Sequence, residues 1–227
     1  MALAIQDYPD SLFLFNNNIF ETLSIMLWDN TIIFLGLLTQ RIETMGHISY
    51  LTGQPNNGPQ SINDALYKLE NTSVLFCRAW QQVPPDRTRA GRESANAMEH
   101  LDHIVNEILR ARDTRMAKGT YSGSQLEAYL NIKAGVMTSP VTIAQQQAMV
   151  AAGPGQGKVP GQPVQITLVR LLNKIKHRHY QSANFRIQAG QHIFVINVDK
   201  PNKTPDSIAE FNILEFCALC TNAVPHL

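Results

Sequence analysis

Few cysteines and few charged residues limit what this 227-residue chain can be. Its 3 cysteines include a close pair, Cys217 and Cys220, and do not form the set of bridges that stabilises a small secreted domain. A reducing compartment is therefore the simpler expectation. Charged residues make up 16% of the chain and hydrophobic residues 44%, which is the balance of a globular protein with a core.

The chain also lacks a segment typical of secretion or of a membrane span. Residues 1–13 have no basic region followed by an apolar run, as a signal peptide requires. The most apolar window, Ile19–Leu38, is interrupted by Glu21, Asp29 and Asn30. A charged residue in the middle of a bilayer costs roughly 2.5–3.5 kcal/mol. We interpret this window as a buried helix and expect a cytoplasmic protein without a membrane span.

Apolar residues recur at three- and four-residue steps over much of the chain, which predicts helices. The expected helices cover residues 19–45, 61–83, 92–118, 124–133 and 139–152, then a basic helix from Pro163 and a last helix opening at Pro205 or Asp206. Residues 184–187 and 192–198 alternate, with Gly190 between them, which predicts a β-hairpin. The expected fold is mainly α, a multi-helix up-down bundle with a small β-hairpin inserted before the C-terminal helix.

One stretch, GPGQGKVPGQP at residues 153–163, is too rich in glycine and proline for regular structure. It predicts a helical bundle over residues 1–152, a loop over 153–163, and a helix-hairpin-helix over 164–227 that completes the same core. A single domain and a domain with an appended subdomain both remain open. The stretch is not a phosphate-binding loop, because Ala152 and Val159 occupy positions where that motif needs glycine and serine or threonine.

The net charge of +1 gives no general attraction to polyanions, so any nucleic-acid site must be a local patch. The basic helix offers one. Arg170 and His177 are seven residues apart, about two helical turns, and Asn173 lies between them on the same face. Histidine titrates near neutrality and can move a proton, whereas arginine makes permanently charged contacts with phosphate. The strip therefore combines groups suited to phosphodiester chemistry.

Arg170-x6-His177 resembles the Arg-x4–6-His motif of HEPN-type helical bundles, which include toxin and abortive-infection ribonucleases. In that family two copies of the motif face each other across a dimer. The resemblance implies a homodimeric, metal-independent endoribonuclease, or a related RNA-binding protein, in a defence or toxin–antitoxin setting. Arg170, Asn173 and His177 would be catalytic. The residues expected to bind the RNA backbone are Lys174, Lys176, Arg178 and His179.

A second interpretation takes the same strip as solvated surface. Its cations would pair with nearby acids, and the protein would be a non-catalytic helical module that binds another protein through the hairpin edge or the basic helix. Arg87, Arg89 and Arg92, which follow Pro84-Pro85 in an expected loop, form a further candidate patch for a partner.

Two other groups contain residue types that bind metals. Glu99, His103 and Glu107 step by four along one expected helix face, but that face is opposite the apolar stripe, and surface pairing of histidine with glutamate explains them. Cys217 and Cys220 form a single CxxC, to which His226 and Cys77 could contribute, and a zinc site needs four well-placed ligands. We interpret the cysteines as small buried hydrophobic residues and expect no metal and no cofactor.

Overall fold

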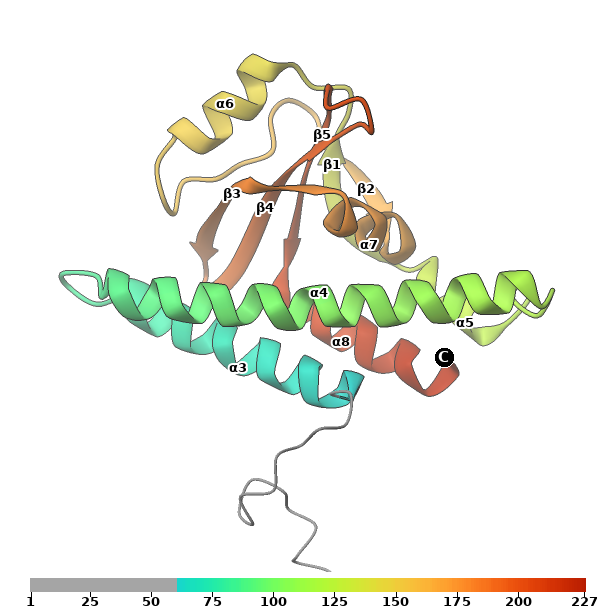
Figure 1. The fold of residues 1–227 in the computed structure, drawn as a ribbon. Coiled ribbons are helices and arrows are strands. Elements are labelled where there is room, and N and C mark those ends of the chain that lie inside the picture. Colours follow the sequence, from blue (N-terminus) through green and yellow to red (C-terminus); the bar gives the residue numbers. More distant parts are fainter. Residues whose placement is uncertain (1–60) are drawn as a thin grey trace, which may run out of the picture. The chain divides into compact units, whose positions relative to one another are not determined.

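Residues 61–227, the part of the chain that the computed structural model describes, fold as a five-stranded antiparallel sheet packed on a layer of helices (Figure 1). They belong to a unit spanning Pro59–Leu227. The helix expected over residues 19–45 lies outside the described residues. Within them, none of the helices has the length and apolarity needed to cross a membrane.

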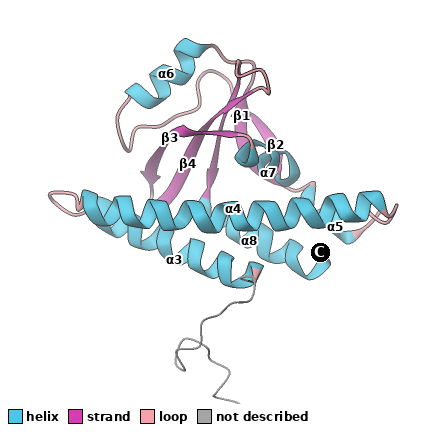
Figure 2. Cartoon of the chain, viewed as in Figure 1, coloured by secondary structure: helices cyan, strands magenta, loops and turns pink. Residues whose placement is uncertain are grey.

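The elements follow one another with short connections, apart from the longer segment of residues 152–163 between α6 and β2. The helices are α3 (Ile62–Trp80), α4 (Arg87–Ala117), α5 (Gln125–Leu130), α6 (Ile143–Ala151), α7 (Leu168–Lys176) and α8 (Ile213–Ala223). The strands are β1 (Lys133–Thr138), β2 (Val164–Thr167), β3 (Arg178–Gln188), β4 (Gln191–Asp199) and β5 (Pro205–Asn212). The strand order is β2-β1-β5-β4-β3, and all neighbours are antiparallel (Figure 2).

The main core lies between one face of the sheet and the helices α3, α4 and α8 (Figure 1). Helix α4 contributes a buried stripe that includes Leu101, Ile104 and Ile108. Alternate residues of the strands, such as Ile196 in β4 and Phe211 in β5, belong to the same cluster. The period of 3.6 in the helix and of 2 in the strands lets both elements present one continuous apolar face to this core.

The opposite face of the sheet is covered by α6 and by the segment Gly153–Pro160, which we call the strap. Helix α6 places Met149 against Val195 and Ile208 of the sheet. The strap is bound to strand β3, because Gly157 N–H donates to Phe185 O at 3.1 Å and Asn184 Nδ2 donates to Gly153 O at 3.0 Å. Both faces of the sheet are therefore occupied.

The expectation of a mainly α bundle with a small hairpin is wrong. The hairpin lies where the sequence places it, with Ala189 and Gly190 at positive φ in a two-residue turn, but its strands are two of five. Strand β5 occupies residues that were expected to open the last helix. Ile208 faces the α6 side and Phe211 the main core, so their spacing reflects two faces of a strand and not one face of a helix.

Strands β2 and β1 also lie where the sequence predicts no strand. Strand β2 uses residues that were expected in the first turn of the basic helix, after Pro163. The helix begins at Leu168 instead, where the hydroxyl of Thr167 accepts the N–H of Arg170. Strand β1 lies between the expected helices at 124–133 and 139–152, and it is too short, at 6 residues, for its pattern to stand out.

Candidate functional site

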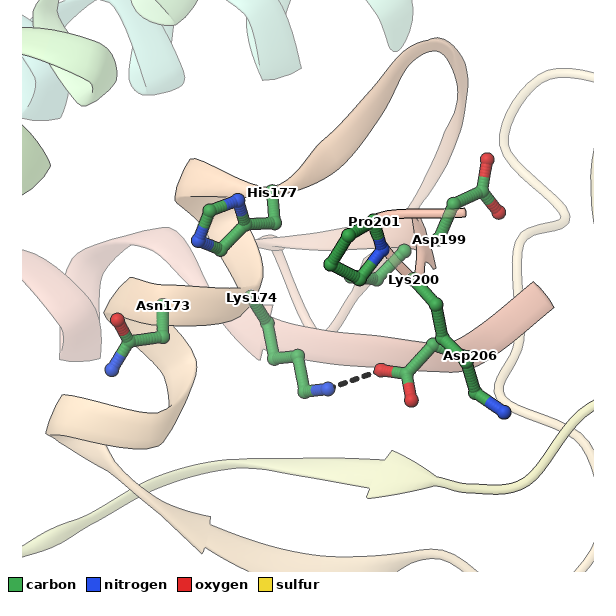
Figure 3. Close-up of a pocket in the computed structure, with 8 residues that line it drawn as sticks. Asn173, Lys174, His177, Asp199, Lys200, Pro201 and Asp206 are labelled. Atoms are coloured by element: carbon green, nitrogen blue, oxygen red, sulfur yellow. Dashed lines mark hydrogen bonds and ion pairs between the residues drawn. The ribbon is translucent and has the colours of Figure 1, made fainter. Parts of the chain in front are cut away.

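A hollow of about 470 Å³ lies at the end of the sheet between the C-terminal end of α7 and the turn that joins β4 to β5 (Figure 3). Its volume is within the range of small-ligand pockets. Polar residues predominate among those that line it, which are Asn173, Lys174, His177, Val198, Asp199, Lys200, Pro201 and Asp206.

Helix α7 orients the polar side of this hollow. Leu168, Leu171 and Ile175 are fully buried, so the opposite side of the helix faces away from the core. The helix is shorter than expected and ends at Lys176. His177 is the residue that terminates it, and β3 begins at the next position. The imidazole therefore lies beside the β4–β5 turn (Figure 3).

An ion pair lies within the hollow. The ammonium of Lys174 donates to the carboxylate of Asp206, which also accepts the hydroxyl of Ser207 at 2.9 Å (Figure 3). Burial raises the pKa of the Asp206 carboxyl, but the hydrogen bonds from Lys174 and Ser207 and the charges of Lys174 and Lys200 outweigh it, so the pKa is lowered. Asp206 is ionised at neutral pH and compensates the charge of Lys174.

The structure brings together two of the three residues of the expected catalytic strip. Asn173 and His177 both line the hollow, and the amide of Asn173 is held by donation of Nδ2 to Val169 O at 2.8 Å. Arg170 is exposed on the same helix but does not line the hollow. At about 1.5 Å of rise per residue it lies about 10 Å from His177 along the helix axis.

The four residues expected to bind RNA have different surroundings. Lys176 and His179 are exposed, and Lys174 is paired with Asp206. Arg178 is directed at α4, where its two terminal nitrogens donate to the carboxylate of Asp102 at 2.6 and 2.8 Å. Arg178 also donates to Ile175 O at 2.9 Å. This guanidinium joins the start of β3 to α4 and is directed into the fold.

One buried group was not identified as a site from the sequence. His192, at the start of β4, stacks on Phe76 of α3 with ring centroids 4.5 Å apart and contacts Phe185 edge-on. Its Nδ1 is 3.2 Å from the hydroxyl of Ser73. Burial lowers the pKa of His192 to about 4. The alternation of the hairpin places residue 192 on the inward face, but Ser73 and Phe76 are more than a hundred residues away in sequence, so no local pattern indicates the contact.

No group of three or more histidine, cysteine, aspartate or glutamate side chains is arranged to hold a metal ion within residues 61–227. In the expected Glu99–Glu107 group, Glu107 pairs with Arg110, and burial, followed by the charge of Lys68, lowers the pKa of His100. The cysteines are buried and free. Burial raises the pKa of Cys217 to about 12, so its thiol stays protonated at neutral pH.

Comparison with known protein families, curated proteins and solved structures gives no match for this chain.

Proposed function

We propose that this chain binds single-stranded RNA along the outward face of α7, with one phosphodiester held at the hollow. The observation that supports this most is the continuity of that face, which leads from the exposed Arg170 past Asn173 to His177 at the hollow. The lining itself is balanced, because it has two lysines and two aspartates. The surplus of positive charge comes from the exposed Arg170 and Lys176 beside it.

The amide of Asn173 favours the binding of RNA over the binding of DNA. Its Nδ2 donates to Val169 O, which fixes the amide and leaves Oδ1 as an acceptor beside the hollow. A ribose 2′-hydroxyl can donate to such an acceptor, and a deoxyribose cannot. The proposal therefore includes weaker binding of a DNA strand of the same sequence.

The proposal is binding without cleavage. His177 could move a proton, but Arg170 lies outside the hollow and Lys174 is paired with Asp206. The arginine that the motif supplies to offset the charge that a phosphate gains during cleavage is therefore not at the hollow, and Lys200 of the lining is assigned to binding the phosphate. Metal-free cleavage of RNA that disappears in His177→Ala would overturn this part and support the nuclease instead.

The test is fluorescence anisotropy with a labelled single-stranded RNA. We expect Arg170→Ala and Lys200→Ala each to weaken binding about five-fold. Each should also lower the slope of the logarithm of the binding constant against the logarithm of the salt concentration by the amount that corresponds to about one phosphate contact. Lys118→Ala is the matched control, because it removes one exposed cation that does not line the hollow. An equal loss in the control, or no binding at low salt, would contradict the proposal.

A protein partner is the second candidate. Ile143 and Val150 of α6 are 61% and 40% exposed, and their separation of seven residues places them on one face of that helix. Exposed apolar side chains grouped on one face are typical of protein-binding surfaces. Absence of RNA binding would leave this candidate as the better supported one.

A further inference from the structure

His192 joins two hairpins of the fold. It lies at the start of β4, next to the β3–β4 turn, and its ring is enclosed by Phe76 of α3, Phe185 of β3 and Phe194 of β4. The residue is 8% exposed, and Ser73 of α3 provides its hydrogen-bond partner. The imidazole therefore connects the α3–α4 hairpin to the β3–β4 hairpin through the hydrogen bond to Ser73 and the ring contact with Phe76, while Phe185 and Phe194 enclose it from its own hairpin.

We propose that His192 is an acid-operated latch, whose protonation releases the closed end of the α3–α4 hairpin, from Ser73 to Ala90, from the β3–β4 hairpin. A protonated imidazole donates from both ring nitrogens and carries a full charge, which costs free energy in an apolar site without an opposite charge. Separation of the two hairpins gives the cation access to water.

The surroundings of His192 do not compensate such a charge. A space of about 40 Å³ adjoins the ring, and its lining comes from α3, α4, α8 and both strands of the hairpin. The lining residues besides His192 are Leu69, Phe76, Ser94, Ala97, Met98, Leu101, Phe185, Phe194 and Ile213, and none of them is ionisable. The ionisable residues adjacent in sequence to the lining are Lys68, Glu70 and Cys77 on α3, Glu93, Glu99, His100 and Asp102 on α4, and Arg186 on β3, and none of them lines the space.

This corner of the fold is a satellite of the main core, which it meets at Leu69, Leu101 and Ile213. Phe76, Cys77, Ala79 and Ala90 form a cluster of their own, against which Trp80, Phe185 and Ile187 pack. Small satellite clusters open with less free energy than a whole domain needs to unfold. The corner can therefore open while the main core stays closed.

The direction of the pH effect follows from the pKa of His192, which is about 4 in the closed form and 6.5 in water. Above pH 6.5 the imidazole is neutral in both forms, and pH has no effect. As the pH falls from 6.5 to 4, the open form takes up a proton that the closed form does not. Opening therefore becomes more favourable, by about ten-fold per pH unit and on the order of a hundred-fold in all, and levels off below pH 4.

The experiment is hydrogen–deuterium exchange of the full chain between pH 7 and pH 4, read by mass spectrometry and corrected for the intrinsic pH dependence of exchange. We expect the opening of Ser73–Trp80 and of residues 185–194 to increase on the order of a hundred-fold, with α7 unchanged. His192→Phe keeps an aromatic ring and removes the titration, so its opening should be independent of pH. His100→Gln, the matched control on the same helical hairpin, should keep the effect.

Three outcomes would overturn the proposal. The first is an unchanged pH dependence in His192→Phe, and the second is its loss in His100→Gln. The third is equal acceleration in α7 and in residues 101–117 of α4, which pack in the main core, because this would indicate global unfolding. Where His192→Phe does not fold, proton NMR of the wild-type protein decides the question. A His192 ring titrating near pH 4 supports the latch, and one titrating near 6.5 refutes it.

Discussion

Two glycines show how differently one substitution can act at the scale of a residue. Gly157 in the strap is buried, and a Cβ atom built there would be 2.8 Å from the Cβ of Asn184. Gly91 in α4 is exposed, and a Cβ atom there has nothing within 4 Å. We expect Gly157→Ala to lower the free energy of unfolding by about 1–3 kcal/mol, because the strap must move away from β3.

Gly91→Ala is the matched variant, and we expect it to raise the free energy of unfolding by about 0.5–1 kcal/mol, because alanine loses less backbone entropy in a helix. Urea denaturation of both variants measures the difference. Equal effects would show that the strap does not pack on β3 as closely as the structure indicates.

At the scale of a residue, the sequence predicts contacts between residues that lie within four positions of each other, such as helix caps. Ser61 and Ser124 were expected to start helices, and each hydroxyl accepts an N–H three residues later. The start of α6 was placed at Ser139-Pro140, but Thr142 is the cap, with Gln145 completing a capping box. The contact of Ser73 with His192 spans 119 positions, and local spacing carries no information about it.

At the scale of an element, Arg178, which is the first residue of β3, attaches this strand to α4. Its guanidinium is directed at Asp102 and is largely buried, with 10% of the side chain exposed. We expect Arg178→Ala to lower the free energy of unfolding by about 1.5–3 kcal/mol, because hydrogen bonds between charged groups are lost and Asp102 is left without its partner.

Lys176→Ala is the control for Arg178→Ala. It removes one positive charge from an exposed side chain two residues earlier, and we expect a change within about 0.5 kcal/mol. Thermal unfolding followed by circular dichroism compares the two variants. A loss of stability in Lys176→Ala as large as that in Arg178→Ala would show that net charge, and not the contact with Asp102, is responsible.

Elements differed in how well they could be predicted because length decides whether a period is visible. Helices α3 and α4, with 19 and 31 residues, repeat their apolar stripe several times and were expected within a few residues of their bounds, apart from the earlier start of α4. Strand β2 has 4 residues and β1 has 6, so neither completes enough alternations to exclude a helix. The apolar stripe predicts which side of α7 is buried, but the sequence does not predict that this helix ends at Lys176.

At the scale of the whole molecule, the sheet depends on pairings between distant segments. Val136 of β1 pairs with Glu210 of β5, and β2 is paired with β1 from the other side. A hairpin is visible in a sequence because a turn joins its strands, whereas the place of β1 between β2 and β5 has no such marker. The same limit explains why the sequence does not predict the hollow, because its walls come from α7 and from a turn that follows β4.

The closed arrangement of these layers leads to a last prediction, that a fragment of residues 59–227 folds by itself. Helices cover one face of its sheet, α6 and the strap cover the other, and the described residues supply a main core whose buried members run from Ala65 onward. We expect a free energy of unfolding of about 5–15 kcal/mol, as for other single domains. In urea, circular dichroism and the fluorescence of Trp80, the fragment's one tryptophan, should change together at pH 7. Separate transitions would show that the corner around Phe76 and His192 opens before the main core even when His192 is neutral, and a fragment without a cooperative transition would show that residues 1–58 are needed for folding.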